Sequence, residues 1–294
     1  MNDSNSSIDS FVSVCDANPK LKWFALADAA QHPGLPSALR FANSRAKCLL
    51  CSGQSQIEAY APHLIELPLP SVASNEWKWI LRNSIKFPCV TLLAAEYEFE
   101  EIFERLSNCC EVKMPSGEIM YLAFWDPAIL GTLLGQDDDY TLHVKGPVMT
   151  RKQRSWFTEK LTSWWYWDRN GCLHKTSVET TDASMQDVTL EFTQEQVDDL
   201  IEASIPDHLL YYLNTNQTKL INTILPSQRY GLVRRALLSA YDIGLNSMRD
   251  LMNFACISLI YGERLQRDIV IIDLLEKVAR KEIAFSDALT LLPE

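Results

Sequence analysis

Cysteine and histidine residues at short spacing are the first candidates for chemistry in this sequence. Cys48-x-x-Cys51 has the spacing of a zinc-binding or redox pair, and Cys172-x-His174 is a second close pair. The two pairs complete a four-ligand zinc site only if the segment around Cys172 folds against the strand that carries Cys48. Gly53 indicates a turn after the first pair, whereas a redox motif needs the pair at a helix N-terminus. We favour the interpretation that Cys48 and Cys51 end a strand and that one thiol lies in the core.

The other candidates are histidines, aspartates and the motifs of nucleotide-binding proteins and hydrolases. None of the five histidines is spaced for a two-histidine metal site on one helix. Asp137-Asp138-Asp139 lacks the alternating ligands, glycine and final glutamate of a calcium loop, so we expect a solvated acidic loop. The sequence has no Walker, G-x-G-x-x-G or G-x-S-x-G pattern. We expect no catalytic residue, no metal and no cofactor, although a Cys–His or Ser–His pair that meets only in the folded chain stays open.

The composition is that of a globular protein with an acidic surface. The 294 residues are 47% hydrophobic and 22% charged, with a formal net charge of −11. Nucleic acids and anionic membranes bind clustered Lys and Arg, so we expect neither as a partner. Residues 1–10 lack the basic start and apolar run of a signal peptide, and no apolar run approaches the thickness of a bilayer. We therefore expect a cytoplasmic protein whose eight cysteines are reduced.

Residues 111–134 are the stretch around which the chain is organised. Pro115-Ser116-Gly117 is typical of a tight turn, and the apolar run Ile119–Trp125 predicts a strand covered on both faces. Asp126 is placed to cap the helix that follows, and Pro127 suits the first position of that helix. These roles are structural, so we expect this unit to be scaffold.

The same stretch carries a resemblance to a known family. Residues 117–130, G-E-I-M-Y-L-A-F-W-D-P-A-I-L, resemble the signature of a bacterial domain family associated with type VI secretion, whose members are effector adaptors or chaperones. Residues 23–30, 51–53 and 60–64 agree with the same family pattern, and the resemblance covers roughly residues 22–170. Family members usually carry arginines where this chain has Ala123 and Ala128, so no role of those arginines transfers. The residues that we assign to the structural motif are Asp28, Gly53, Pro62, Gly117, Asp126 and Pro127.

The periodicity predicts an α+β protein with a mixed α/β sheet domain followed by a helical lobe. The expected domains are an N-terminal extension (1–20), the sheet domain (21–180) and the C-terminal lobe (181–294). The first half alternates strands near 21–27, 46–51, 64–67 and 89–94 with helices near 36–43, 57, 76–85 and 96–106. This alternation predicts a mostly parallel sheet. In the second half, we expect a hairpin at 163–175, a helix that Pro206 breaks, and helices at 227–241, 246–262 and 265–279.

Two surfaces are candidates for contact with a partner. In the strand 163–167 the side chains of Trp164 and Tyr166 face one side and those of Trp165 and Trp167 face the other. At least one pair belongs to the core, and the outer pair either forms a contact patch or covers a helix.

The second candidate is the helical lobe at residues 227–262. Its large aromatic and arginine side chains are of the kind that anchor interfaces, namely Tyr230, Arg234, Tyr241 and Arg249. The alternative is that the two tyrosines pack between the lobe's own helices and that only the arginines reach water.

The resemblance implies a function for these surfaces. We expect a non-catalytic adaptor that binds a secreted effector protein in the cytoplasm and helps to load it onto the type VI spike protein. Capture of an apolar effector segment by apolar helix faces fits that role. The alternative is a hydrolase or metal-dependent enzyme built on the mixed sheet.

Overall fold

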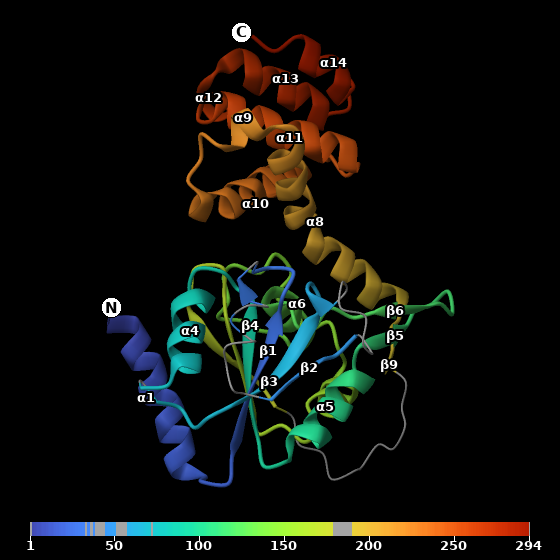
Figure 1. Cartoon of the computed structure of the whole chain (residues 1–294). Coiled ribbons are helices and arrows are strands. Elements are labelled where there is room, and N and C mark those ends of the chain that lie inside the picture. Colours follow the sequence, from blue (N-terminus) through green and yellow to red (C-terminus); the bar gives the residue numbers. More distant parts are fainter. Residues whose placement is uncertain are drawn as a thin grey trace. The chain divides into compact units, whose positions relative to one another are not determined.

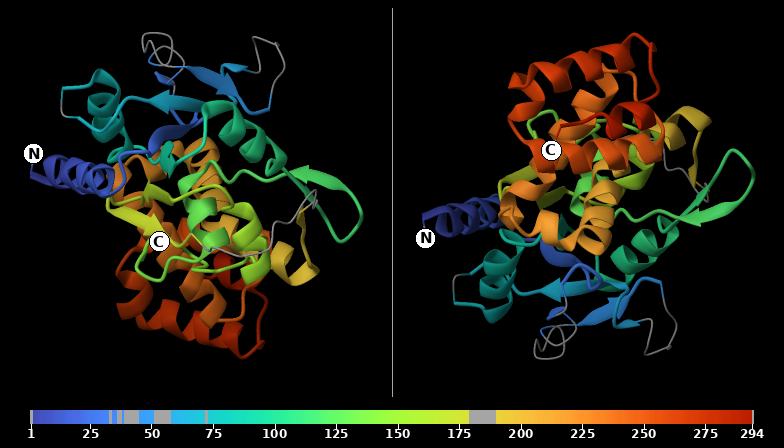
Figure 2. Two further views of the ribbon diagram at one scale, coloured as in Figure 1. Left: turned by 90° about the horizontal axis from the view of Figure 1, so that it is seen from below. Right: turned by 90° about the horizontal axis from the view of Figure 1, so that it is seen from above.

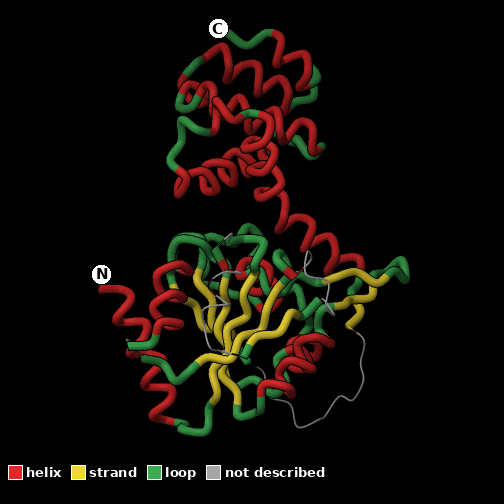
Figure 3. The backbone as a smooth tube through the Cα atoms, viewed as in Figure 1, coloured by secondary structure: helices red, strands yellow, loops and turns green. Residues whose placement is uncertain are grey.

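The structure is a computed structural model, and it describes residues 2–32, 34–35, 38, 45–50, 58–71, 73–178 and 190–293. Cys51, Gly53 and the helix expected around residue 57 lie outside the described residues, as does most of the helix expected at 36–43. The chain forms two compact units, residues 1–203 and residues 204–294. In the described part, strands occur in the first unit and the second unit is helical (Figure 3), which confirms the α+β class. No helix within the described ranges combines the length and apolar character that a membrane span needs.

A six-stranded sheet forms the centre of the first unit (Figure 1). Its strand order is β2-β3-β1-β4-β7-β8. The bounds are β1 Lys22–Asp28, β2 Ala46–Cys48, β3 Pro62–Leu67, β4 Val90–Ala95, β7 Ser163–Trp167 and β8 Leu173–Thr176. The expected strands of the first half correspond to β1–β4, and the expected hairpin corresponds to β7 and β8.

The prediction that this sheet is mostly parallel is wrong. Each recorded pairing of neighbouring strands in the sheet is antiparallel. The segment β3, α4 (Asn75–Ser84) and β4 is the β–α–β unit that the alternation indicates, so β3 and β4 run in the same direction. β1 lies between them and runs opposite to both. The local pattern indicates the direction of consecutive strands, but it does not indicate which strand is inserted between them.

Helices cover both faces of the sheet and create two cores. On one face, α1 (Asn2–Ala17) and α4 pack over Trp23, Trp165 and Trp167. On the other face, α5 (Phe99–Asn108), α6 (Pro127–Leu134) and α7 (Arg151–Phe157) pack over Trp164 and Tyr166. All five residues of β7 are buried, so both aromatic pairs belong to a core and neither forms a contact patch.

A small three-stranded sheet carries the central stretch. Its order is β6-β5-β9, with bounds β5 Glu111–Lys113, β6 Ile119–Tyr121 and β9 Leu190–Glu191. β5 pairs antiparallel with β6 and parallel with β9. Gly117, at φ +89°, forms the β5–β6 turn in the left-handed region that glycine tolerates. Figure 2 shows that this hairpin projects away from the six-stranded sheet.

The strand predicted for Ile119–Trp125 is therefore only partly present. β6 ends at Tyr121, and its three side chains are exposed rather than covered. Leu122, Phe124 and Trp125 are buried, but they lie in irregular backbone that leads into α6. The apolar run consists of an exposed hairpin arm followed by a buried segment without strand structure. The prediction treated both parts as one buried strand because apolar residues alone do not distinguish them.

The second unit is helical. The bounds of the helices from residue 194 onward are α8 Gln194–Asn216, α9 Thr218–Ile221, α10 Pro226–Asp242, α11 Met248–Tyr261, α12 Arg264–Arg267, α13 Ile269–Ala279 and α14 Phe285–Thr290. The predicted capping box at Thr193 and Gln196 is present, with reciprocal backbone hydrogen bonds of 3.0 and 3.3 Å. The break predicted at Pro206 is wrong, because α8 continues through it. The single helix predicted at 265–279 is two helices, since the Asp268 carboxylate caps a new helix at the N–H of Val270.

Candidate functional site

The residues of the structural motif cap and connect elements of the first unit. Asp126 Oδ1 accepts hydrogen bonds from the N–H groups of Ala128 (2.8 Å) and Ile129 (3.4 Å), and Pro127 occupies the first turn, as predicted. Asp126 Oδ2 accepts a further bond of 2.6 Å from Gln31 Nε2, which ties the start of α6 to the end of β1. Sequence reasoning missed this second contact, because Gln31 lies 95 positions away.

Asp28 lies beside this cap and is buried. Its Oδ1 accepts a hydrogen bond of 2.9 Å from the N–H of Ala30, and its Cα partner in the β1–β3 ladder is Pro62. Burial, and then the negative charge of Asp126, raise the pKa of the Asp28 carboxyl to about 6. The motif thus brings two carboxyl groups close together at the end of β1.

The described cysteines differ in burial. Cys89, Cys109 and Cys110 are buried, and burial raises the pKa of each thiol to about 12, so they are protonated and unreactive at neutral pH. Cys172 is exposed. Cys48 lies in β2 opposite His63 of β3. Over the described part of the chain, no group of three potential metal ligands contains a cysteine.

A buried polar cluster lies where β7, β8 and the loop after α6 meet. Asp139, Asp168 and His174 each offer one ligand atom, and these atoms lie within 4.8 Å of one another. The prediction of a solvated acidic loop at 137–139 is wrong for Asp139, whose side chain is 0% exposed, whereas Asp138 is exposed. Asp139 accepts hydrogen bonds from the N–H and hydroxyl of Thr141, both at 2.7 Å, and the resulting local turn draws its carboxylate inward.

The cluster extends to Tyr166 and the signature helix α6. The Tyr166 hydroxyl donates a hydrogen bond of 2.9 Å to Asp139 Oδ2, and its ring stacks on the ring of His174. Burial and the neighbouring carboxylates raise the pKa of Tyr166, so this hydroxyl remains a donor. A Cβ added at Gly131 would lie 2.5 Å from the Tyr166 oxygen. Gly131 therefore permits the close approach of α6 to β7.

The four residues predicted to bind a partner lie in α10 and at the start of α11. Tyr230, Arg234 and Tyr241 are partly buried, and Tyr241 packs against the helical core, while Arg249 is exposed. Tyr230, Arg234 and Tyr241 share one face of α10 with Leu238, because the four follow one another at intervals of four, four and three residues. Leu238 is 45% exposed and was missed, since a leucine at helical spacing is typical of a core position.

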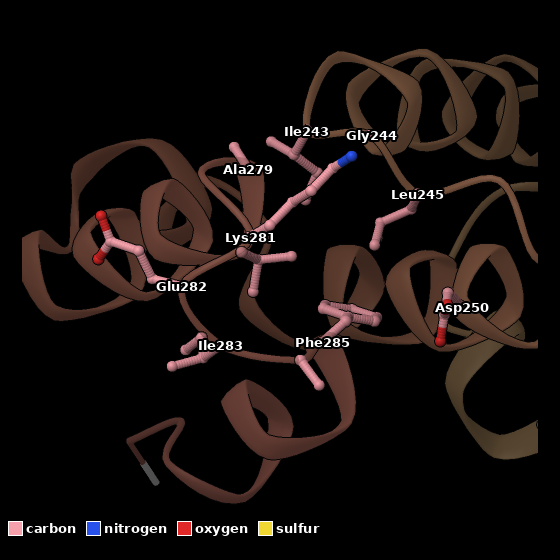
Figure 4. A pocket seen from close by; sticks show the side chains of 11 residues that line it. Ile243, Gly244, Leu245, Asp250, Ala279, Lys281, Glu282, Ile283 and Phe285 are labelled. Carbon is pink, nitrogen blue, oxygen red and sulfur yellow. The ribbon is translucent and has the colours of Figure 1, made fainter.

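A pocket of about 400 Å³ lies in the second unit, after the C-terminal end of α10 (Figure 4). The α10–α11 connection and the segment from α13 to α14 form its walls. Apolar side chains of Ile243, Leu245 and Phe285 line it together with the charged side chains of Asp250 and Lys281. Residues 243–245 lie between Tyr241 and Arg249 in the sequence, and Asp250 directly follows Arg249, so the pocket and two predicted contact residues belong to one stretch of the chain. We call this region, with Leu238, Tyr241, Arg249 and the pocket, the α10–α11 surface.

Residues 23–143 match the model of a family described as a domain of unknown function, DUF4123. The match begins in β1 and ends in the loop after α6, so it contains the structural motif and the first part of the buried polar cluster. It does not reach α10 or α11. No curated protein and no solved structure matches this chain.

Proposed function

We propose that this protein is a non-catalytic adaptor that binds a type VI secretion effector in the cytoplasm and helps to load it onto the spike protein. The resemblance of the signature at residues 117–130 supports the type VI context, and the family match at 23–143 covers the same stretch. The observation that carries the proposal is that the residues of the structural motif serve as turns and caps inside the matched region, as Asp126 and Gly117 do. Exposed apolar side chains occur both in the matched region, as in β6, and in the helical unit beyond it, where Leu238 shares α10 with Tyr230 and Arg234.

The α10–α11 surface is the proposed contact with the effector. Leu238 supplies exposed apolar area, Arg249 supplies a positive charge, and Ile243, Leu245 and Phe285 in the pocket would contact an apolar side chain of the effector. An amphipathic helix that presents a bulky apolar residue beside an acidic residue has the chemistry to bind there. Binding would also remove apolar surface of the effector from water, which is how a chaperone limits aggregation.

Affinity capture tests the proposal. Tagged protein purified from its own cells is expected to bring down one effector and the spike protein, with the effector present near equimolar amount. The effector and the spike protein are identified by mass spectrometry, and an unrelated acidic protein with the same tag is the control. Capture of neither protein under conditions in which the type VI system is expressed contradicts the proposal.

A further inference from the structure

The buried polar cluster has features that a hydrogen-bond network alone does not require. Two carboxylates, Asp139 and Asp168, are buried within 4.8 Å of each other and of His174. Burial of a carboxylate is costly unless a positive charge lies against it. Among the described residues, neither carboxylate forms an ion pair with a lysine or arginine, and the recorded ion-pair contact of Asp168 is with His174.

The surrounding groups hold each carboxylate in one orientation. The N–H groups of Asn170 and Cys172 both donate to Asp168 Oδ1 at 2.8 Å, and Thr141 holds Asp139 Oδ1. The other oxygen of each carboxylate faces the remaining members of the cluster, with Asp139 Oδ2 next to Tyr166 and Asp168 Oδ2 next to His174. Metal-binding carboxylates are commonly fixed in this way by hydrogen bonds to the oxygen that does not bind the metal.

His174 is oriented in the same manner. Its Nε2 lies 3.2 Å from Asp168 Oδ2, on the side of the buried carboxylates. Its Nδ1 is buried and makes no hydrogen bond, although it lies 3.2 Å from Asp138 Oδ2. A carboxylate next to the second ring nitrogen is the usual arrangement around a metal-binding histidine, because it fixes the ring and strengthens the ligand.

We propose that Asp139, Asp168 and His174 bind one divalent metal ion, with Zn²⁺ as the best fit and Mn²⁺ as the second. Two carboxylates and one imidazole form a donor set that suits both ions. All three side chains are at least nine-tenths buried, so substrate has no access and the ion is structural. It would fasten the loop of residues 135–145 to the β7–β8 hairpin, behind the signature helix α6. This site goes beyond the proposed adaptor function and does not depend on it.

Isothermal titration of the full-length, EDTA-treated protein with zinc sulfate, and separately with manganese chloride, tests the site directly. One equivalent of Zn²⁺ is expected to bind, and the melting temperature is expected to rise with added zinc, because the ion binds the folded state. Asp139→Asn and His174→Gln should each weaken zinc binding by at least about tenfold. Asp137→Asn changes an exposed aspartate of the same loop and should leave the affinity unchanged.

Three results would overturn the proposal. The first is that the wild-type protein binds neither ion in the titration. The second is that Asp139→Asn and His174→Gln bind zinc as tightly as the wild type. The third is that a variant with Cys48, Cys51 and Cys172 replaced by serine loses the zinc site, which would assign the ion to thiolates. A wild-type protein that binds neither ion overturns the proposal even if a variant fails to fold.

Discussion

At the scale of single residues, the carboxylates of the first unit have separate roles that their surroundings set. Asp126 caps α6, Asp28 is buried beside it, and Asp139 is enclosed by Thr141 and Tyr166. Only the first of these roles follows from local sequence, because the Asp-Pro pair before an apolar run is a helix start. The other two depend on which distant segments pack against the residue.

The capping role predicts a specific loss of stability. Asp126→Ala removes the acceptor of two backbone N–H groups at the start of α6, and should lower the free energy of unfolding by about 1 kcal/mol. Asp126→Asn keeps a capping oxygen and serves as the control, with a smaller loss expected. Urea denaturation at pH 7 measures both. Equal stability of Asp126→Ala and the wild type would show that the cap contributes nothing.

The buried Asp28 predicts a dependence of stability on pH. Its folded pKa of about 6 lies above the unfolded value near 3.8, so the folded state binds the proton more tightly. Its stabilising contribution is therefore complete below pH 4 and is lost as the pH rises through 6. Each unit of difference corresponds to roughly 1.4 kcal/mol. Urea denaturation of the wild type and of Asp28→Asn between pH 4 and 7.5 should show the wild type losing stability relative to the variant.

If the free energy of unfolding changes equally with pH in the wild type and in Asp28→Asn, the raised pKa of Asp28 is ruled out. Asp28→Asn retains an oxygen that accepts from the N–H of Ala30, so the variant removes the titration and keeps the hydrogen bond. The folded pKa can also be followed directly by NMR titration of the Asp28 carboxyl carbon.

At the scale of elements, the close approach of α6 to β7 couples the signature helix to the buried polar cluster. Gly131→Ala places a methyl group against the Tyr166 hydroxyl, so it should destabilise by about 1–3 kcal/mol although alanine favours helix. In a Tyr166→Phe background the same substitution should cost less, because the clashing oxygen is absent. Denaturation of the two single variants and the double variant measures this coupling.

Gly231 provides the matched control for this prediction. It lies in α10, and the nearest atom to an added Cβ is 3.5 Å away at the end of the Arg235 side chain. Gly231→Ala should therefore stabilise the protein by up to about 1 kcal/mol. If Gly131→Ala is also neutral or stabilising, α6 and β7 are not held at the distance described.

At this scale the sequence predicts the local elements but not how distant segments pair and pack. The strands of the first half, the capped start of α6, the Thr193 capping box and most helices of the second unit could be predicted, because each rests on local periodicity or cap chemistry. The strand order could not, since β1 is inserted between two strands that are consecutive in the chain. The polar cluster was missed for a related reason, because Asp139 and His174 are brought together only by the packing of the loop on the hairpin.

At the scale of the whole molecule, we propose that the first unit is scaffold and that the second unit carries the effector contact. The family match ends at residue 143, and the exposed residues Leu238 and Arg249 lie beyond it. Charge reversal of both candidate arginines, Arg234 and Arg249, would not be selective, because Arg234 is partly buried and its substitution also perturbs packing. Substitution of two exposed residues avoids this problem.

The effector contact is tested by the amount of effector that copurifies with the double variant Leu238→Asp/Arg249→Glu. Both positions are exposed, so the variant should keep the melting temperature of the wild type to within a few degrees. Leu291→Asp/Arg267→Glu makes the same chemical changes at exposed positions of the helical unit that do not line the pocket, and is the control. We predict that the first variant loses the effector and that the control retains it. Retention of the effector at the wild-type level by the folded Leu238→Asp/Arg249→Glu variant would contradict the assignment of the contact to the α10–α11 surface.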